Sequence, residues 1–87
     1  MSTMRTWTIW EVVPDEDGGF YHLRVNSLGG PAGNTETIKI GRKRLLLLLN
    51  YFDVREVSDL YTKTFESTEL KAAAALYDFL LKILQFD

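Results

Sequence analysis

The chain has 87 residues, enough for one domain but too few for separate catalytic and regulatory units. Its formal net charge of −2 is mild, which argues against a protein dedicated to the phosphate backbone of nucleic acids. Without cysteine it has no disulfide framework, thiol nucleophile or zinc-thiolate site. A chain of this size buries only about two-thirds of its unfolded surface, so any excess of apolar side chains favours association.

Three β-strands are predicted in the first half of the chain, at about residues 5–13, 20–28 and 35–40. The first is dense in β-formers such as Trp7 and Ile9, which alternate with threonine. Pro14 ends it, and the turn cluster 15–19 leads into the second strand as a hairpin. The glycine-rich stretch 29–34 precedes the third strand. Three consecutive strands joined by loops favour an antiparallel meander.

Three helices are predicted in the second half, at about residues 42–52, 54–65 and 67–86. A run of five leucines favours the first helix. Val54, Val57, Tyr61 and Phe65 recur at helical spacing in the second. No glycine or proline interrupts the third, for which Ser67 is a candidate cap. The sequence therefore predicts a single α+β domain of order βββααα, with its helices packed on one face of a three-stranded sheet.

The last predicted helix is apolar on two faces. At roughly 100° per residue, a polar stripe about 80° wide occupies only one side of it. The first apolar face carries Leu70, Ala73, Tyr77, Leu80, Leu81 and Leu84. The second carries Ala72, Leu76, Phe79, Ile83 and Phe86. We expect the sheet to cover the first face, and either the preceding helices or a second copy of the chain to cover the second.

The predicted sheet has an outer face that no helix covers. One register points Trp7, Ile9 and Val13 inward and leaves Trp10 and Arg24 outside, whereas a shift by one residue exchanges the two tryptophans. In either register one tryptophan faces away from the helices. Exposed aromatic side chains are enriched at interfaces, so the outer face is a candidate binding surface.

Catalytic chemistry has little support in the sequence. His22 is the only histidine and lacks a second ligand for a transition metal. It has Glu11 as a candidate acid–base partner, but a small open sheet offers little pocket for a substrate. The carboxylates of residues 15–17 begin like a calcium loop, but the later oxygen ligands do not follow. We therefore expect no catalytic residue, no cofactor and no metal site.

Arg42, Lys43 and Arg44 form the one basic cluster of the sequence, at the start of a predicted helix. Cations there are slightly unfavourable for the helix dipole, so they either hold a phosphate or keep the leucine run solvated. The stretch from Ile40 through this cluster to Phe52 is similar to one half of helix-hairpin-helix DNA-binding modules. The resemblance covers under a quarter of the chain and lacks the preceding helix, so it assigns no family.

The overall prediction is a non-enzymatic binding or regulatory protein that acts by protein–protein association, as a homodimer. The predicted self-association surface comprises Leu76, Phe79, Ile83 and Phe86. The predicted surface for a heterologous protein partner comprises Trp10 and Arg24. The alternative is nucleic-acid binding by Arg42, Lys43, Arg44 and the sheet aromatics. The sequence shows no secretory signal or membrane span, so we expect a cytoplasmic location.

Overall fold

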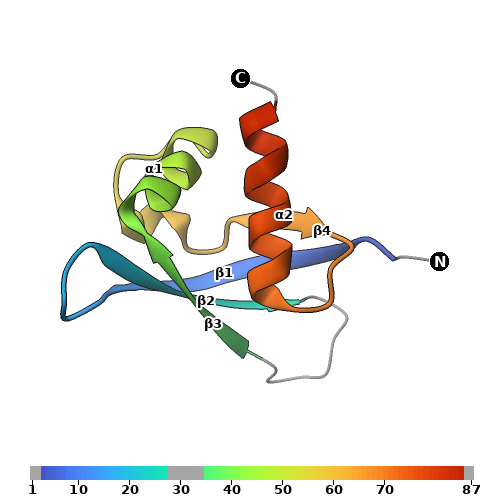
Figure 1. Cartoon of the computed structure of the whole chain (residues 1–87), viewed down its shortest axis with the longest axis horizontal. Coiled ribbons are helices and arrows are strands. Elements are labelled where there is room, and N and C mark those ends of the chain that lie inside the picture. Colours follow the sequence, from blue (N-terminus) through green and yellow to red (C-terminus); the bar gives the residue numbers. More distant parts are fainter. Residues whose placement is uncertain (1–2, 28–34, 86–87) are drawn as a thin grey trace.

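The computed structural model describes residues 3–27 and 35–85, which form a β-sheet with helices on one face (Figure 1). The four strands are antiparallel in the order β3-β2-β1-β4: β1 (Arg5–Pro14), β2 (Phe20–Ser27), β3 (Thr35–Gly41) and β4 (Thr64–Ser67). The helices are α1 (Arg42–Tyr51) and α2 (Ala72–Gln85), with a short 3₁₀ helix, η1 (Val57–Leu60), between them. The α+β class is confirmed, but the predicted three strands and three helices are wrong.

The predicted helix over residues 54–65 accounts for most of that error. The segment instead forms η1 and then β4, which pairs antiparallel with β1 and places Phe65 opposite Trp7. Phe65 and Ser67 are buried while Thr64 and Glu66 are exposed, which is the period of two expected of a strand. The helical spacing of the apolar residues is therefore a coincidence, since Phe65 faces the core from β4 whereas Tyr61 is exposed.

The last helix begins later than predicted, at Ala72 rather than at Ser67. Ser67 is the last residue of β4, and its hydroxyl oxygen accepts a hydrogen bond from the backbone N–H of Glu69 at 3.1 Å. The hydroxyl itself donates to Oδ2 of Asp78 at 2.8 Å. Ser67 therefore organises the turn before α2 and contacts the helix from the sheet, but it does not cap the helix. The predicted end at residue 86 lies outside the described residues.

A β-bulge in β1 decides which tryptophan is buried. Ile9 lies opposite Val25 and Glu11 lies opposite Arg24, which leaves Trp10 as the extra residue. The bulge interrupts the alternation of faces, so Trp10 and Glu11 are both exposed. Trp7 and Ile9 are buried as in one of the two registers considered. Beyond the bulge, however, Val12 packs against the core while Val13 is exposed.

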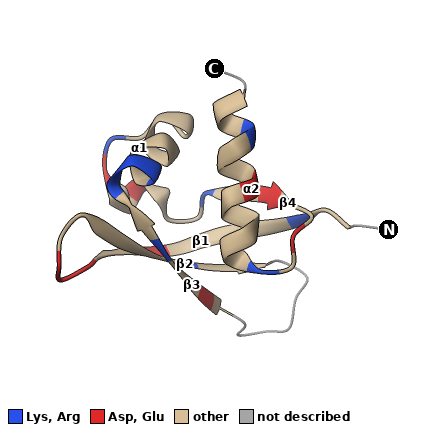
Figure 2. Cartoon of the chain, in the orientation of Figure 1, with Lys and Arg blue, Asp and Glu red and all other residues tan. Residues whose placement is uncertain are grey.

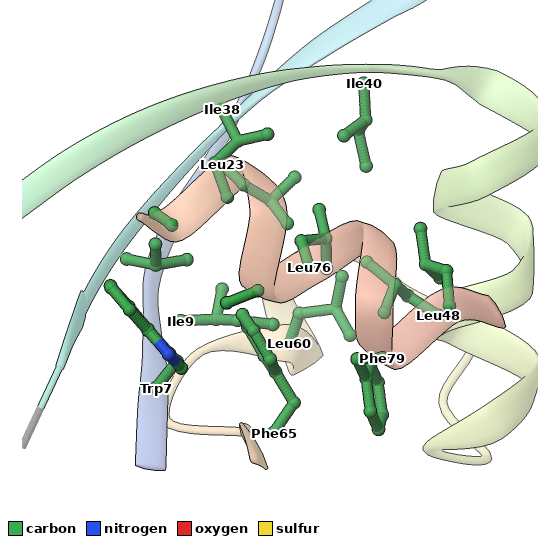
Figure 3. Packing of buried hydrophobic residues seen from close by; sticks show 14 of the residues in the cluster. Trp7, Ile9, Leu23, Ile38, Ile40, Leu48, Leu60, Phe65, Leu76 and Phe79 are labelled. Atoms are coloured by element: carbon green, nitrogen blue, oxygen red, sulfur yellow. The ribbon is translucent and has the colours of Figure 1, made fainter. Parts of the chain in front are cut away.

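The hydrophobic core lies between the sheet and the two helices, with side chains from every element contributing (Figure 3). Leu76 and Phe79 of α2 point into it, against residues from β1, β4 and η1. Phe65 joins the two ends of the core, since its ring stacks with Trp7 at 6.5 Å and with Phe79 at 5.4 Å between centroids. This packing fixes how α2 lies relative to α1, and the two helices together form the first candidate surface.

Candidate functional site

The face of α2 that was predicted to associate lies largely inside the protein. Leu76 is fully buried, and Phe79 is buried with its ring against Phe65 and, edge-on, against Tyr51 at 5.0 Å. Ile83 is partly buried against the core. Phe86 lies outside the described residues. Leu76 and Phe79 are therefore not available to a partner unless the core opens.

The opposite apolar face of α2, predicted to pack on the sheet, is the one that is exposed. Tyr77, Leu81 and Leu84 lie on successive turns of the helix, and Leu81 keeps 59% of its surface accessible. With Leu47 of α1 they line a groove of about 320 Å³, whose floor includes Leu80. Leu80 is the member of this face that the core covers. The two helices thus leave an open apolar groove between them.

One charged residue, Arg44, lines this groove, and an ion pair lies on the other flank of α2. The guanidinium carbon of Arg44 lies 4.9 Å from the ring centroid of Tyr77, a cation–π arrangement at the α1 side. Asp78 and Lys82 lie one turn apart on the other flank of α2 and form an ion pair at 3.3 Å. In Figure 2 most of α2 carries no charge. An apolar centre with a polar rim is the usual composition of a protein interface.

The carboxyl of Asp78 is held ionised by its neighbours. The hydrogen bond from the Ser67 hydroxyl is the main reason that the pKa of Asp78 lies below its usual 3.8, and Lys82 acts in the same direction. Partial burial opposes both effects. The negative charge on this flank of α2 therefore persists to acidic pH.

A second surface lies on the outer face of the sheet. Trp10 is 41% exposed, and its ring contacts the ring of Tyr61 edge-on at 6.0 Å between centroids. Glu11 and Arg24 lie beside it as a loose ion pair with 4.0 Å between the carboxylate and the guanidinium. The prediction named Trp10 and Arg24 but missed Tyr61. The sequence pattern predicts Tyr61 to lie in a helix. In the structure it instead follows η1 in an irregular segment, which brings its ring to Trp10.

The three consecutive cations at the start of α1 do not share a direction. All three are exposed, but successive residues of a helix are about 100° apart, and only Arg44 lies over the ring of Tyr77. The backbone N–H of Arg42 donates to the carbonyl oxygen of Gly19 at 3.1 Å, which ties this end of α1 to the β1–β2 turn. Strand β3 runs directly into α1, so the first helix of a helix-hairpin-helix module is missing from this position.

His22 pairs with Asp15 rather than with Glu11. Nε2 of His22 lies 2.8 Å from Oδ1 of Asp15 at the base of the β1–β2 turn, and this hydrogen bond is the main reason that the pKa of Asp15 is lowered. Within residues 3–27 and 35–85, no three histidine, cysteine or carboxylate side chains gather as metal ligands would. The pair lies on an open hairpin, and we assign it no chemistry.

The chain matches no family model, no curated protein and no solved structure. In the described part of the chain, neither helix has the length and apolar character needed to cross a bilayer. The function is therefore argued from the two surfaces themselves.

Proposed function

We propose that this is a non-enzymatic binding protein that works by protein–protein association and forms a homodimer through the groove between α1 and α2. One observation carries the proposal: Tyr77, Leu81 and Leu84 expose an apolar stripe over two turns of a helix whose other face is already packed. Exposed apolar groups that lie together, rather than scattered singly, mark interaction sites. Burying them would also supply the apolar coverage that a short chain has difficulty providing alone.

The charges beside the stripe support a second copy as the occupant. In a two-fold dimer the same surface meets itself, and two antiparallel α2 helices would pair residues that are symmetric about the crossing point. Along α2, the apolar stripe from Tyr77 to Leu84 and the ion pair of Asp78 and Lys82 have nearly the same midpoint, close to residue 80. If two antiparallel α2 helices cross at that midpoint, their apolar stripes pack together. Asp78 of each copy then lies close to Lys82 of the other.

Introducing a charge inside the groove tests this proposal. Leu81→Glu would place a carboxylate in the centre of the interface, where burying it without a partner is costly. Leu46→Glu is the matched control, since Leu46 is an exposed leucine (52%) of α1 that does not line the groove. In size-exclusion chromatography with light scattering, we expect Leu81→Glu to elute as a monomer and Leu46→Glu to remain a dimer. Identical masses for the two variants would overturn the proposed interface.

Nucleic-acid binding is the alternative proposal, and one arrangement favours it. The hydrogen bond from Arg42 to Gly19 brings the exposed cations of α1 to the end of the sheet at which Lys39 lies over the ring of Phe20, 4.7 Å from its centroid. Cations beside an aromatic ring are suited to single-stranded nucleic acid. The proposal requires salt-sensitive binding of an oligonucleotide that Arg42→Ala with Lys43→Ala weakens. No binding at low salt would end it.

A further inference from the structure

The surface around Trp10 and Tyr61 is held in place by two irregular features of the backbone. The bulge in β1 turns both Trp10 and Glu11 to the outer face, where a regular strand would present only one of them. Bulges often occur beside functional sites because they redirect side chains in this way. The result is a tryptophan and a carboxylate that are adjacent in sequence and share one exposed surface.

The second irregular feature is the residue after Tyr61. Thr62 has a φ of 70°, a left-handed conformation that is unfavourable for a β-branched residue. Two backbone hydrogen bonds hold it: the N–H of Thr62 donates to the carbonyl of Ile9 at 2.8 Å, and the N–H of Ile9 donates to that of Lys63 at 2.9 Å. They fix Tyr61 beside the bulge. Strained conformations of this kind concentrate where a site must be preorganised.

Two hollows flank Trp10, and their linings differ in chemistry. The first, about 330 Å³, is lined mainly by the rings of Trp10 and Tyr61 and by Val12 and Val57. The second, about 430 Å³, is more polar and is lined by Trp10 together with Arg24, Asn26 and Thr35. Glu11 lines both hollows. An aromatic-walled hollow thus lies next to a polar one, with a carboxylate at the boundary.

The polar hollow has hydrogen-bond acceptors to offer. Oδ1 of Asn26 is buried and has no hydrogen-bond partner among the described residues. The carboxylate of Glu11 pairs with Arg24 at 4.0 Å, and both side chains are about half exposed, so this pair is weak and easily exchanged. A cationic side chain with several N–H donors satisfies both groups, and the face of Trp10 favours a cation as well.

We propose that this surface binds an extended, proline-containing peptide segment that carries a basic side chain. Proline-rich segments form a polyproline II helix without internal hydrogen bonds, and they dock in grooves lined by aromatic rings. The proline ring occupies the first hollow, against the rings of Trp10 and Tyr61 and the side chains of Val12 and Val57. The arginine or lysine occupies the second hollow, against Glu11 and Asn26. This site shares no lining residue with the groove between α1 and α2, so it does not depend on the proposed dimer.

Titration of the ¹⁵N-labelled chain by NMR tests the proposal. The probe is the capped hexapeptide Pro-Pro-Arg-Pro-Pro-Arg, compared with Pro-Pro-Glu-Pro-Pro-Glu and Gly-Gly-Arg-Gly-Gly-Arg. We expect saturable shifts of the Trp10 indole and the Tyr61 amide with the first peptide, and at least about tenfold weaker binding of the other two. If the glycine peptide bound as tightly as the proline peptide, the arginine charge alone would account for binding, and the proposed role of proline would be overturned. The absence of any saturable shift would overturn the site.

Variants and other ligand classes complete the test. Trp10→Ala should weaken binding by about tenfold or more, as expected for the central aromatic of an interface. Val13→Ala, an exposed residue further along the same strand, should leave it unchanged. Glu11→Gln keeps the shape of the site and should weaken the arginine peptide, which keeps the proposal testable if Trp10→Ala fails to fold. Tighter binding of oligo-dT or maltohexaose at the same resonances would contradict a peptide ligand.

Discussion

The hydroxyl of Ser67 donates a 2.8 Å hydrogen bond to the carboxylate of Asp78, joining the last residue of β4 to the second turn of α2. Ser67 is fully buried and also accepts the backbone N–H of Glu69 at 3.1 Å. One serine thus satisfies two polar groups at the turn before α2. The angle at which α2 leaves the sheet depends on this contact, and so does the groove that α2 forms with α1.

Removal of the Ser67 hydroxyl should lower the stability of the fold substantially, although only one oxygen atom is lost. Ser67→Ala removes the acceptor of the Glu69 N–H and leaves the Asp78 carboxylate with only its ion pair to Lys82, so we expect it to lower the free energy of unfolding by about 1–3 kcal/mol. Thr68→Ala is the control, because Thr68 is the exposed neighbour of Ser67. Urea denaturation of both variants at one chain concentration measures the difference. Equal stability of the two would contradict the bridging role of Ser67.

Acid should weaken the fold through Asp78. Its pKa is lowered in the folded state below the usual 3.8 of an aspartate, chiefly by the Ser67 hydroxyl. The stabilisation is therefore fully present above the unfolded pKa and is lost as the pH falls through the folded pKa. We expect Asp78→Asn to be less stable than the native chain near neutral pH, and the difference to shrink progressively as the pH falls below about 4. A midpoint above 3.8 in an NMR titration of the Asp78 carboxyl would contradict this account.

The five-leucine run offers a matched pair for testing the orientation of α1. Leu48 is fully buried, whereas Leu46 is more than half exposed two residues earlier in the same helix. Leu48→Ala should cost about 2–5 kcal/mol because it leaves a cavity in the core. Leu46→Ala should change stability by no more than about 0.5 kcal/mol. Comparable losses in chemical denaturation would mean that α1 is rotated from its described position.

Because Thr62 is strained, we expect that its replacement by glycine does not destabilise the protein. A left-handed conformation costs a residue with a Cβ atom about 1–2 kcal/mol, which roughly matches or exceeds the entropic cost of glycine. Thr62→Gly should therefore leave the thermal midpoint unchanged or raise it. Thr37→Gly, at an exposed site in the regular strand β3, should lower it. A similar fall in both variants would contradict a strained conformation at Thr62.

The sequence predicted the strands better than the elements that follow α1. Trp7, Ile9 and their neighbours alternate over a long stretch, and β1, β2 and β3 begin where the pattern placed them. Strand β4 has four residues and a single apolar one, Phe65, so it has almost no alternation to detect. Its pairing with β1 is a long-range contact that local spacing does not encode.

The candidate surfaces were predicted only in part, because packing decides which apolar face is free. Both faces of α2 are visible in the sequence, but Leu76 and Leu81 look equivalent until the position of α1 and β4 is known. The bulge at Trp10 is likewise a property of the pairing between two strands, and Tyr61 reaches it only through the strained Thr62. The amino-acid composition shows that aromatic residues are present, but it does not predict which of them come together in space.

The most direct measurement is the mass of the purified native chain by sedimentation equilibrium over a range of micromolar concentrations. The account predicts a reversible monomer–dimer equilibrium, with the mass rising toward twice the 10.0 kDa of one chain. A single species of 10.0 kDa at every concentration would contradict the proposed homodimer.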